Sequence, residues 1–277
     1  MKAQVRQKVK ELIPIQEIPT QFCKDLCYFF TDIDDTLTEK GMLPHGSYKA
    51  LWQLFQNNIN IIPVTGRPAG WCDHIARMWP VKAVIGENGA FYFTYNRDTK
   101  KMERIYLTTV EQRRAAFKRL EKIKEKVLTL IPKARVASDQ PFRLTDLAID
   151  ISEDIKPLSK REVKKIWTIA KDFEANYKVS SIHINCWYGH FNKLKCLKKY
   201  LYDQTGKDLY ALKDNIFFIG DSPNDEPLFR ALPHSAAVAN LKEFFLDLKF
   251  FPKYITAHSS ARGFAQAVDT ILKKRNS

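Results

Sequence analysis

Polar residues that could do chemistry are concentrated in four short segments, each directly after a predicted strand or at the start of a predicted helix. They are Asp32-Ile33-Asp34-Asp35-Thr36, Thr65-Gly66-Arg67, Lys193, and Gly220-Asp221-Ser222-Pro223-Asn224-Asp225. Open parallel sheets bind their ligands just outside the carboxyl ends of their strands. The sequence therefore predicts a ligand site built from carboxylates, a hydroxyl group and basic side chains.

Two of these segments match specific patterns, of which the first alone is only suggestive. A D-x-D-x-T pattern is expected by chance about 0.06 times in a chain of this composition, and G-D-S-x-N-D on the order of once in ten thousand such chains. The second pattern also follows an apolar run, Ile216 to Ile219, as its structural context requires. The occurrence of both patterns in this order is a strong signal.

The elements that must position these groups alternate between strand and helix. Residues 26–31 form a nearly all-apolar run, which is typical of a strand buried on both faces. Ser47 is expected to cap the following helix, and residues 59–64 predict a strand that ends at Thr65. The alternation returns between about residues 192 and 274. This pattern indicates a doubly wound parallel sheet.

Residues 97–188 interrupt this alternation. A helix near residues 111–131 and a second helix after Ser159, which has capping-box spacing to Glu162, are expected to pack on strands of the same segment. The strands are expected near residues 147–151 and 181–187. These elements predict a separate α+β unit inserted into the first domain.

The fold class expected from the sequence is thus α/β, with a doubly wound core and an inserted α+β domain. The core domain is expected to comprise residues 25–96 and 189–277, and the inserted domain residues 97–188. Residues 1–24 form an N-terminal arm, which either packs on the core or is a disordered tail.

Taken together, the four segments resemble the four motifs of the haloacid dehalogenase superfamily. Ile85-Gly86-Glu87-Asn88-Gly89-Ala90 and the placement of the insert are similar to the subfamily with a large α/β cap, which includes Cof-type and sugar-phosphate phosphatases. The resemblance spans residues 26–274 and implies a Rossmann-like core with a cap domain. Leu194 departs from the small residue that usually follows the lysine, and this puts only the local loop in question.

The resemblance implies a catalytic role for each core residue. Asp32 would attack the phosphate ester and form an aspartyl-phosphate. Asp34 would protonate the leaving oxygen and later deprotonate water. Thr65 and Lys193 would bind the transferring phosphoryl group.

A magnesium ion is implied as the cofactor. A carboxylate and a phosphate about 4 Å apart repel each other by roughly 1 kcal/mol in water or 4 kcal/mol at an effective dielectric of 20, so a cation must neutralise them. Magnesium prefers oxygen ligands. The carboxylates of Asp32 and Asp221 and the backbone carbonyl of Asp34 would hold it, with Asp225 supporting them from behind.

The leaving group is expected to meet the cap. Arg143, His183 and Asn185, together with Trp187 and His190, offer donors and aromatic faces that suit sugar hydroxyls, although each could instead support the fold.

From the core, Arg67 and Asn88 are further candidates for substrate contact, and Glu87 is expected mainly to shape a turn. The cap would move on crossings near residues 95–97 and 188–192.

A zinc site is not expected in this segment. His183 and Cys186 would lie on opposite faces of a strand because side chains alternate along it.

Composition narrows the remaining classes of protein. The 277 residues carry a formal charge of +14, and no apolar stretch reaches the roughly 20 residues that span a bilayer. Five cysteines without C-x-x-C spacing and an N-terminus without a signal-peptide pattern predict a cytoplasmic protein with reduced thiols. We expect no membrane partner, and no oligomeric state is predicted.

The sequence favours a magnesium-dependent phosphatase acting on a small-molecule phosphate ester, with a sugar phosphate as the expected substrate. The alternative within enzymes is a phosphohexomutase, which would use the same aspartyl-phosphate. A basic nucleic-acid-binding protein on this fold is a weaker alternative, because the lysines of residues 97–188 are mixed with glutamates along the helices.

Overall fold

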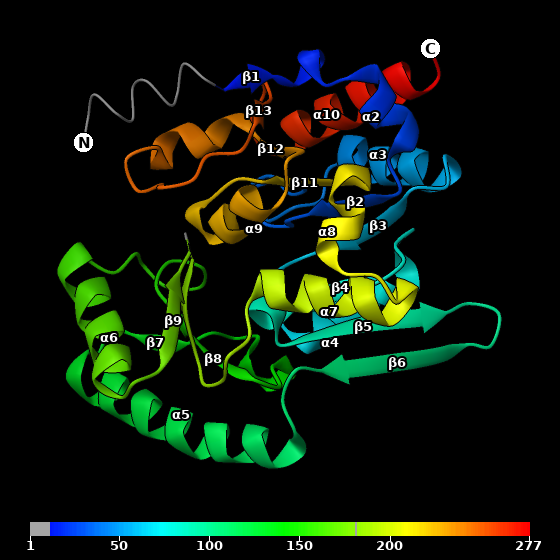
Figure 1. The fold of residues 1–277 in the computed structure, drawn as a ribbon. Helices are drawn as coiled ribbons and strands as arrows, with labels where there is room; N and C mark the ends of the chain where they lie inside the picture. The colour runs from blue at the N-terminus through cyan, green and yellow to red at the C-terminus, as the bar shows by residue number, and fades with distance from the viewer. Residues whose placement is uncertain (1–11, 181) are drawn as a thin grey trace.

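The computed structural model describes residues 12–180 and 182–277, and its core is a parallel sheet (Figure 1). The strand order is β1 (Ile13–Pro14), β13 (Tyr254–Ile255), β12 (Ser235–Ala237), β11 (Ile216–Gly220), β2 (Tyr28–Thr31), β3 (Asn60–Pro63). A bridge between Val64 and Ile85 places β4 (Val84–Gly86) beyond β3. The predicted doubly wound sheet is confirmed. Since β2 and β11 are neighbours, the segments that follow them emerge side by side.

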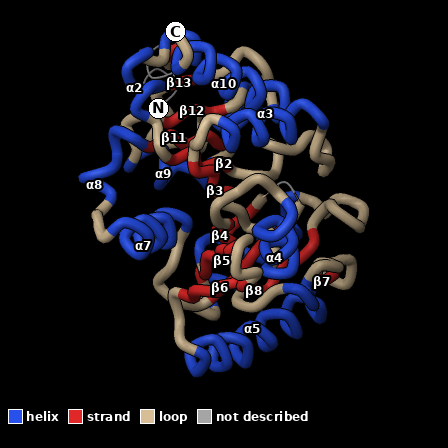
Figure 2. Tube along the Cα trace, turned by 90° about the vertical axis from the view of Figure 1, so that its right-hand side faces the viewer, coloured by secondary structure: helices blue, strands red, loops and turns tan. Residues whose placement is uncertain are grey.

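Helices cover both faces of this sheet (Figure 2). One apolar cluster includes side chains of α2 (Thr20–Asp25), α3 (His45–Gln56), α4 (Ala69–Met78) and α10 (Ser260–Arg275), and the other those of α7 (Lys193–Thr205), α8 (Leu209–Leu212) and α9 (Glu226–Ala231). Phe29 of β2 packs in the first cluster and Phe30 in the second. Successive strand side chains point to opposite faces, which explains why this strand is apolar throughout.

The start of α3 differs from the prediction. The helix begins at His45 after Pro44, and no side chain caps it. Ser47 is fully buried instead, and its Oγ donates a hydrogen bond to the carbonyl of Ala261 at 3.4 Å. The predicted capping role of Ser47 is therefore wrong: the hydroxyl joins α3 to α10.

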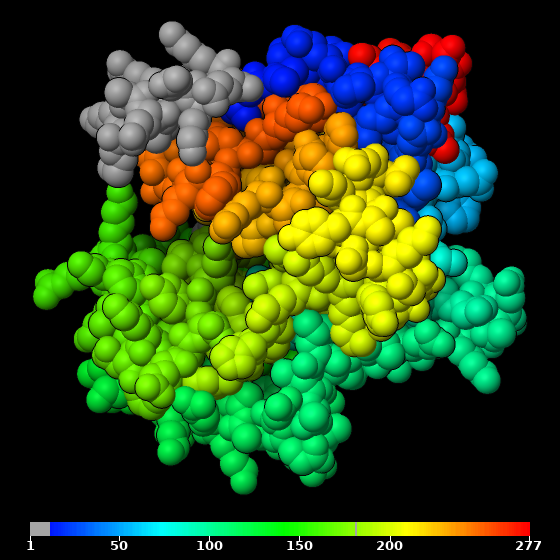
Figure 3. Space-filling view, viewed as in Figure 1, coloured from blue at the N-terminus to red at the C-terminus, as the bar shows by residue number. Residues whose placement is uncertain are grey.

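The inserted unit is a four-stranded antiparallel sheet with two helices on one face. The strands lie in the order β7 (Arg135–Val136), β8 (Asp146–Asp150), β10 (His183–Trp187) and β9 (Asn176–Val179), and the helices are α5 (Val110–Leu130) and α6 (Lys160–Asp172). Both helices begin with the capping boxes of Thr109 and Ser159. In Figure 3 this unit lies against the core.

The two faces of the inserted sheet have different partners. Leu147 of β8 and Ile184 of β10 pack under α5 and α6 in the cap's own apolar cluster. The alternate positions, His183, Asn185 and Asp146, are buried on the opposite face, and Trp187 joins the core cluster. Strand alternation therefore turns a row of polar side chains towards the core.

The first boundary of the insert lies later than predicted. β5 (Phe91–Asn96) pairs with β4 and with β6 (Lys101–Tyr106) in an antiparallel sheet, so residues 97–106 complete a hairpin attached to the core strand β4. The crossing expected near residues 95–97 is thus the tip of that hairpin. The chain enters the insert at residues 107–109, and it returns through residues 188–192, where Gly189 has φ +125°.

The described part of the predicted N-terminal arm packs on the core. β1 extends the sheet beside β13, and Ile15, Ile18 and Phe22 are buried in the first apolar cluster. Residues 1–11 of the arm, and Ser181 at the predicted start of a cap strand, lie outside the described residues.

Short 3₁₀ turns complete the elements: η1 (Ile15–Glu17), η2 (Glu87–Gly89), η3 (Gln140–Phe142), η4 (Lys213–Asn215), η5 (Pro223–Asp225) and η6 (Ala239–Phe244). Among residues 12–180 and 182–277, no helix combines the length and the apolar character needed to cross a membrane.

Candidate active site

Most of the sequence-predicted residues line a cavity of about 690 Å³ between the core and the insert. Its core wall includes Asp32, Asp34, Lys193 and Asp221, and its roof includes His183 of the insert. Asp32 follows β2, Asp221 follows β11, and Lys193 is the first residue of α7. These candidate residues therefore lie together at the carboxyl edge of the sheet.

Lys193 joins two of the carboxylates. Its Nζ lies 2.6 Å from Oδ1 of Asp32 and 2.8 Å from Oδ1 of Asp225, and all three side chains are buried. Burial raises the pKa of Asp32 to about 7, although Lys193 opposes the shift. Burial disfavours the charge of Lys193, yet Asp225 and Asp32 together raise the pKa of its ammonium group well above the usual value. Lys193 thus stays protonated against the two carboxylates.

Asp225 is fixed behind the site by hydrogen bonds to the backbone. Its Oδ2 accepts hydrogen bonds from the backbone N–H groups of Asp221 at 3.1 Å and Ser222 at 3.4 Å. A Cβ atom at Gly220 would collide with this carboxylate, so glycine is required there. Asp225 orients the loop that carries Asp221 as well as Lys193.

The carboxylates fit a divalent cation. Asp32, Asp221 and Asp225 each offer an oxygen within 4.8 Å of the others, and all three are buried. Burial, followed by repulsion from Asp32 and Asp225, raises the pKa of Asp221 well above its usual range. The repulsion between these clustered carboxylates disfavours their charged forms, and a hard cation with oxygen ligands would offset it.

Thr65, like Asp225, lies behind the surface of the cavity. It is fully buried, and its Oγ1 accepts a hydrogen bond from the backbone N–H of Arg67 at 3.0 Å. Its side chain is not among those that line the cavity in the described part of the chain. In this conformation Thr65 shapes the turn that presents Arg67.

Arg67 connects the predicted acid of the core with the insert. Its Nε and Nη2 donate to Asp34 at 2.8 to 3.1 Å, and its Nη1 donates to Oε1 of Glu153 at 3.2 Å. The other Glu153 oxygen lies 2.8 Å from Nε2 of His183. Contact with His183 lowers the pKa of Glu153 to about 2, so the glutamate remains anionic. Glu153 was not anticipated from the sequence.

Arg143, predicted to bind substrate, is engaged by the protein itself. It is 4% exposed and pairs with Asp139 at 2.8 Å and with Asp146 at 3.1 Å. Its Nη1 also donates to the carbonyl of Gly66 in the core. Asn185 in turn donates its Nδ2 to Asp146 at 2.9 Å. Both side chains line the cavity, but the Arg143 guanidinium and the Asn185 amide nitrogen already bind this buried cluster.

Glu87 has a larger structural role than the turn expected from the sequence. It is 1% exposed and accepts hydrogen bonds from the backbone N–H groups of Ala69 at 3.0 Å, Leu144 at 2.9 Å and Thr145 at 2.6 Å. Ala69 belongs to the core and the other two to the insert, so Glu87 docks one on the other. Asn88 beside it lines the cavity, and its buried Nδ2 has no partner among the described residues.

Comparison with known proteins agrees with the geometry. The model of the haloacid dehalogenase-like hydrolase family matches residues 29–131 and 143–268. A phosphoglycolate phosphatase of Methanobrevibacter smithii is 26% identical over 247 residues, which cover 87% of this chain and 96% of that protein.

Solved structures share the fold. A Thermoplasma acidophilum protein superposes with a TM-score of 0.67 at 16% identity, covering 89% of this chain and 98% of that one. A sugar phosphatase described as haloacid dehalogenase subclass IIB superposes with a TM-score of 0.61 at 15% identity, covering 88% and 98%.

Proposed function

The chain belongs to the haloacid dehalogenase-like hydrolases and is a phosphoric monoester hydrolase, and from this premise we propose that it hydrolyses a small phosphorylated metabolite with the help of Mg²⁺. The observation that carries the proposal is the buried arrangement of Asp32, Lys193, Asp225 and Asp221 at the carboxyl edge of the sheet. This arrangement offers a nucleophile, a fixed positive charge and a cation site within one cavity.

In the first step, an Asp32 oxygen attacks phosphorus, and the bond between phosphorus and the leaving oxygen breaks as the acyl-phosphate bond forms. Lys193 fixes the direction of the attacking carboxylate through its 2.6 Å contact. Arg67 also pairs with Glu153, so it stays paired when Asp34 leaves it and takes up a proton from solvent. The protonated Asp34 then gives this proton to the leaving oxygen.

In the second step, water attacks the phosphorus of the aspartyl-phosphate and Asp34 accepts a proton from it. The bond to the Asp32 oxygen breaks, which releases inorganic phosphate and restores the carboxylate. The ammonium group of Lys193 stabilises negative charge on the phosphoryl oxygens in both steps.

The residues that would hold the cation are the carboxylates of Asp32 and Asp221 and the backbone carbonyl of Asp34. A bound Mg²⁺ would neutralise the charge of the phosphate as the carboxylate approaches it. Asp225 would support these ligands through its contacts with Lys193 and the Asp221 backbone.

We further propose that the substrate is a sugar phosphate. The subclass IIB sugar phosphatase supports this by its fold, and the phosphoglycolate phosphatase supports a small hydroxylated phosphate ester more generally. His183 and Asn185 line the roof of the cavity, but Asn185 donates to Asp146 and His183 lies against Glu153, so the sugar phosphate proposal rests on these relatives. The five free cysteines favour a cytoplasmic location, where thiols remain reduced.

The proposal is tested by measuring inorganic phosphate released from a panel of phosphorylated metabolites after chelation and after return of Mg²⁺ or Zn²⁺. Release that stops with chelator and returns with Mg²⁺, but not with Zn²⁺, supports the oxygen-ligand site. Chelator-resistant release contradicts it. Isomerised hexose phosphate without free phosphate would identify a phosphohexomutase instead. The Asp32→Asn variant sets the background for contaminating phosphatases.

A further inference from the structure

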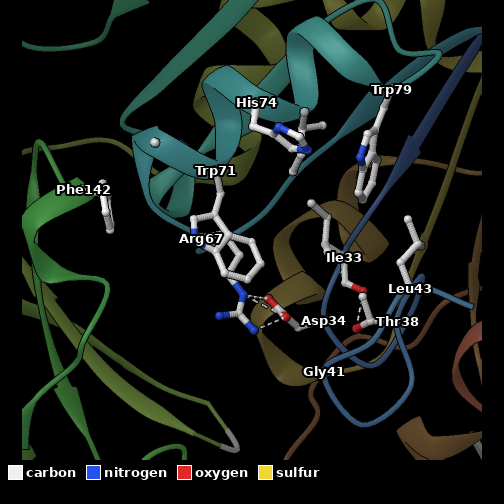
Figure 4. Close-up of a pocket in the computed structure, with 12 residues that line it drawn as sticks. Ile33, Asp34, Thr38, Gly41, Leu43, Arg67, Trp71, His74, Trp79 and Phe142 are labelled. Atoms are coloured by element: carbon white, nitrogen blue, oxygen red, sulfur yellow. Dashed lines mark hydrogen bonds and ion pairs between the residues drawn. The ribbon is translucent and has the colours of Figure 1, made fainter.

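A second cavity, of about 450 Å³, lies beside the catalytic one (Figure 4). Its lining is mainly apolar and includes Ile33, Leu43, Trp71, Ile75, Trp79 and Phe142. Figure 4 shows the side chains of α4 and the residue just after it on one side and those of the loop after β2 on the other. Pockets of roughly 300 to 1,000 Å³ with such a lining are typical small-molecule sites.

The two cavities share a wall. Asp34 and Arg67 line both of them, and their ion pair stands at the boundary. Because Asp34 is the group proposed to protonate the leaving oxygen, the apolar cavity begins where the alcohol part of the substrate leaves phosphorus. A substituent on that alcohol that extends past the ion pair would enter this cavity.

Aromatic rings define the shape of this cavity. The guanidinium group of Arg67 lies 4.5 Å from the ring centroid of Trp71, so the ion pair and the indole are held together. Phe142 of the insert closes the cap side. A Cβ atom at Gly70 would come within 2.9 Å of Phe142, so glycine permits this close approach.

The polar side chains on the roof of the catalytic cavity have few groups left to bind a substrate. Arg143 and Asn185 are committed to Asp146, and His183 lies against Glu153. The apolar cavity, by contrast, has indole and aliphatic surfaces that are open to a ligand. Burial of a flat apolar ring there would distinguish one leaving group from another.

We propose that this cavity binds a planar aromatic ring carried by the alcohol part of the substrate. A sugar phosphate that carries such a ring is a nucleoside monophosphate. Its phosphate would lie at Asp32, its sugar beside the Arg67–Asp34 pair, and its ring between α4 and the loop after β2. The inference rests on the proposed phosphatase activity and narrows its substrate class.

The test compares two esters that differ only by the ring, adenosine 5′-monophosphate and ribose 5-phosphate. The wild-type enzyme with Mg²⁺ is expected to show a kcat/KM at least about tenfold higher for the nucleotide. Trp71→Ala and Trp79→Ala should each reduce the ratio of the two kcat/KM values about tenfold, mainly through KM for the nucleotide, because they remove surface that only the ring can use.

Trp52→Ala is the matched control. Trp52 lies on α3, is 41% exposed against 44% for Trp71, and does not line the cavity. This variant should leave the ratio unchanged. Trp71 is partly exposed, so Trp71→Ala should keep the fold and remains informative even if Trp79→Ala destabilises the protein. Thermal unfolding of each variant shows whether it is folded.

The outcomes separate the two proposals. A wild-type ratio near or below one, or a ratio that both cavity variants leave unchanged, would overturn the ring site while phosphate release from ribose 5-phosphate still supported the phosphatase. Activity on other monoesters but on neither of these two would also overturn it. Failure to release phosphate from every ester would overturn the proposed function itself.

Discussion

Buried charges occur both at the carboxyl edge of the core sheet and at the junction with the cap, but they are balanced differently. At the edge, the clustered carboxylates Asp32, Asp221 and Asp225 share one ammonium group. At the junction, Arg143 is enclosed by two aspartates, and Glu87 is saturated by N–H donors. In the first region, oxygens of three carboxylates lie within 4.8 Å of one another, an arrangement that a divalent cation would complete. The second satisfies its own groups, so its contribution is to position the cap.

The largest effect is expected at the edge. Asp32→Asn should fold normally but lose turnover by more than about a thousandfold, because an amide cannot form the acyl-phosphate. Phosphate release with purified variants measures this. Turnover within about tenfold of the wild type would refute the nucleophile assignment, since tenfold corresponds to only about 1.4 kcal/mol of barrier.

Asp34→Asn separates the role of Asp34 from that of Asp32 in the same loop. It keeps the nucleophile but lacks the proton, so it should still form the phosphoenzyme from an aryl phosphate with a good leaving group. Turnover of an alkyl phosphate should be lost. Equal losses on both esters would assign Asp34 to folding or metal binding instead.

At the junction, Arg143→Met should mainly reduce stability. It leaves Asp139 and Asp146 buried without their cation, and breaking a buried ion pair from one side typically costs about 3–5 kcal/mol. Denaturant unfolding should show this loss. Arg161→Met, at an exposed position of α6, is the control and should change stability by less than about 0.5 kcal/mol. A stable Arg143→Met with selective loss of activity would instead restore its predicted role in substrate binding.

The same contrast explains which parts of the site could be predicted from the sequence. The edge residues stand in short motifs at strand ends, so local spacing located them and the sheet brought them together. Arg67 with Glu153 and Glu87 with Thr145 are separated by 86 and 58 positions, and no periodicity links them. The hairpin of β5 and β6 was missed for a similar reason, because pairing with β4 decides to which unit residues 97–106 belong.

Glu87→Gln should have an intermediate effect. The amide keeps the size of the side chain but turns an NH₂ group towards donors on Leu144 or Thr145, which leaves a buried donor unpaired and costs about 1–3 kcal/mol. Looser docking of the cap should also raise KM. Alanine at the exposed Glu111 of α5 serves as the control.

Glu87 also predicts a pH dependence. Burial raises the pKa of its carboxyl group from 4.5 to about 7. The folded state therefore binds more protons than the unfolded state between these values, so this group's contribution is fully present below pH 4.5 and is lost as pH rises towards 7. The difference in unfolding free energy between wild type and Glu87→Gln, measured from pH 4.5 to 7.5, should shift in that direction. A flat difference would show that the glutamate is ionised throughout.

The smallest effect is expected outside both regions, at His234. Its ring stacks on Phe22 at 3.7 Å, and burial, aided by Lys253, lowers the pKa of the imidazole from 6.5 to about 4. Here the folded state binds fewer protons, so the contribution is fully present above pH 6.5 and is lost as pH falls towards 4. His234→Phe keeps the stacking and removes the titration, so its stability relative to the wild type should improve over that range while kcat/KM at neutral pH stays unchanged. The contribution of His234 to the unfolding free energy therefore rises with pH, whereas that of Glu87 falls. Measuring both variants tests whether burial shifts the pKa of the imidazole down and that of the carboxyl group up. Parallel slopes would contradict the assignment of at least one of the two shifts.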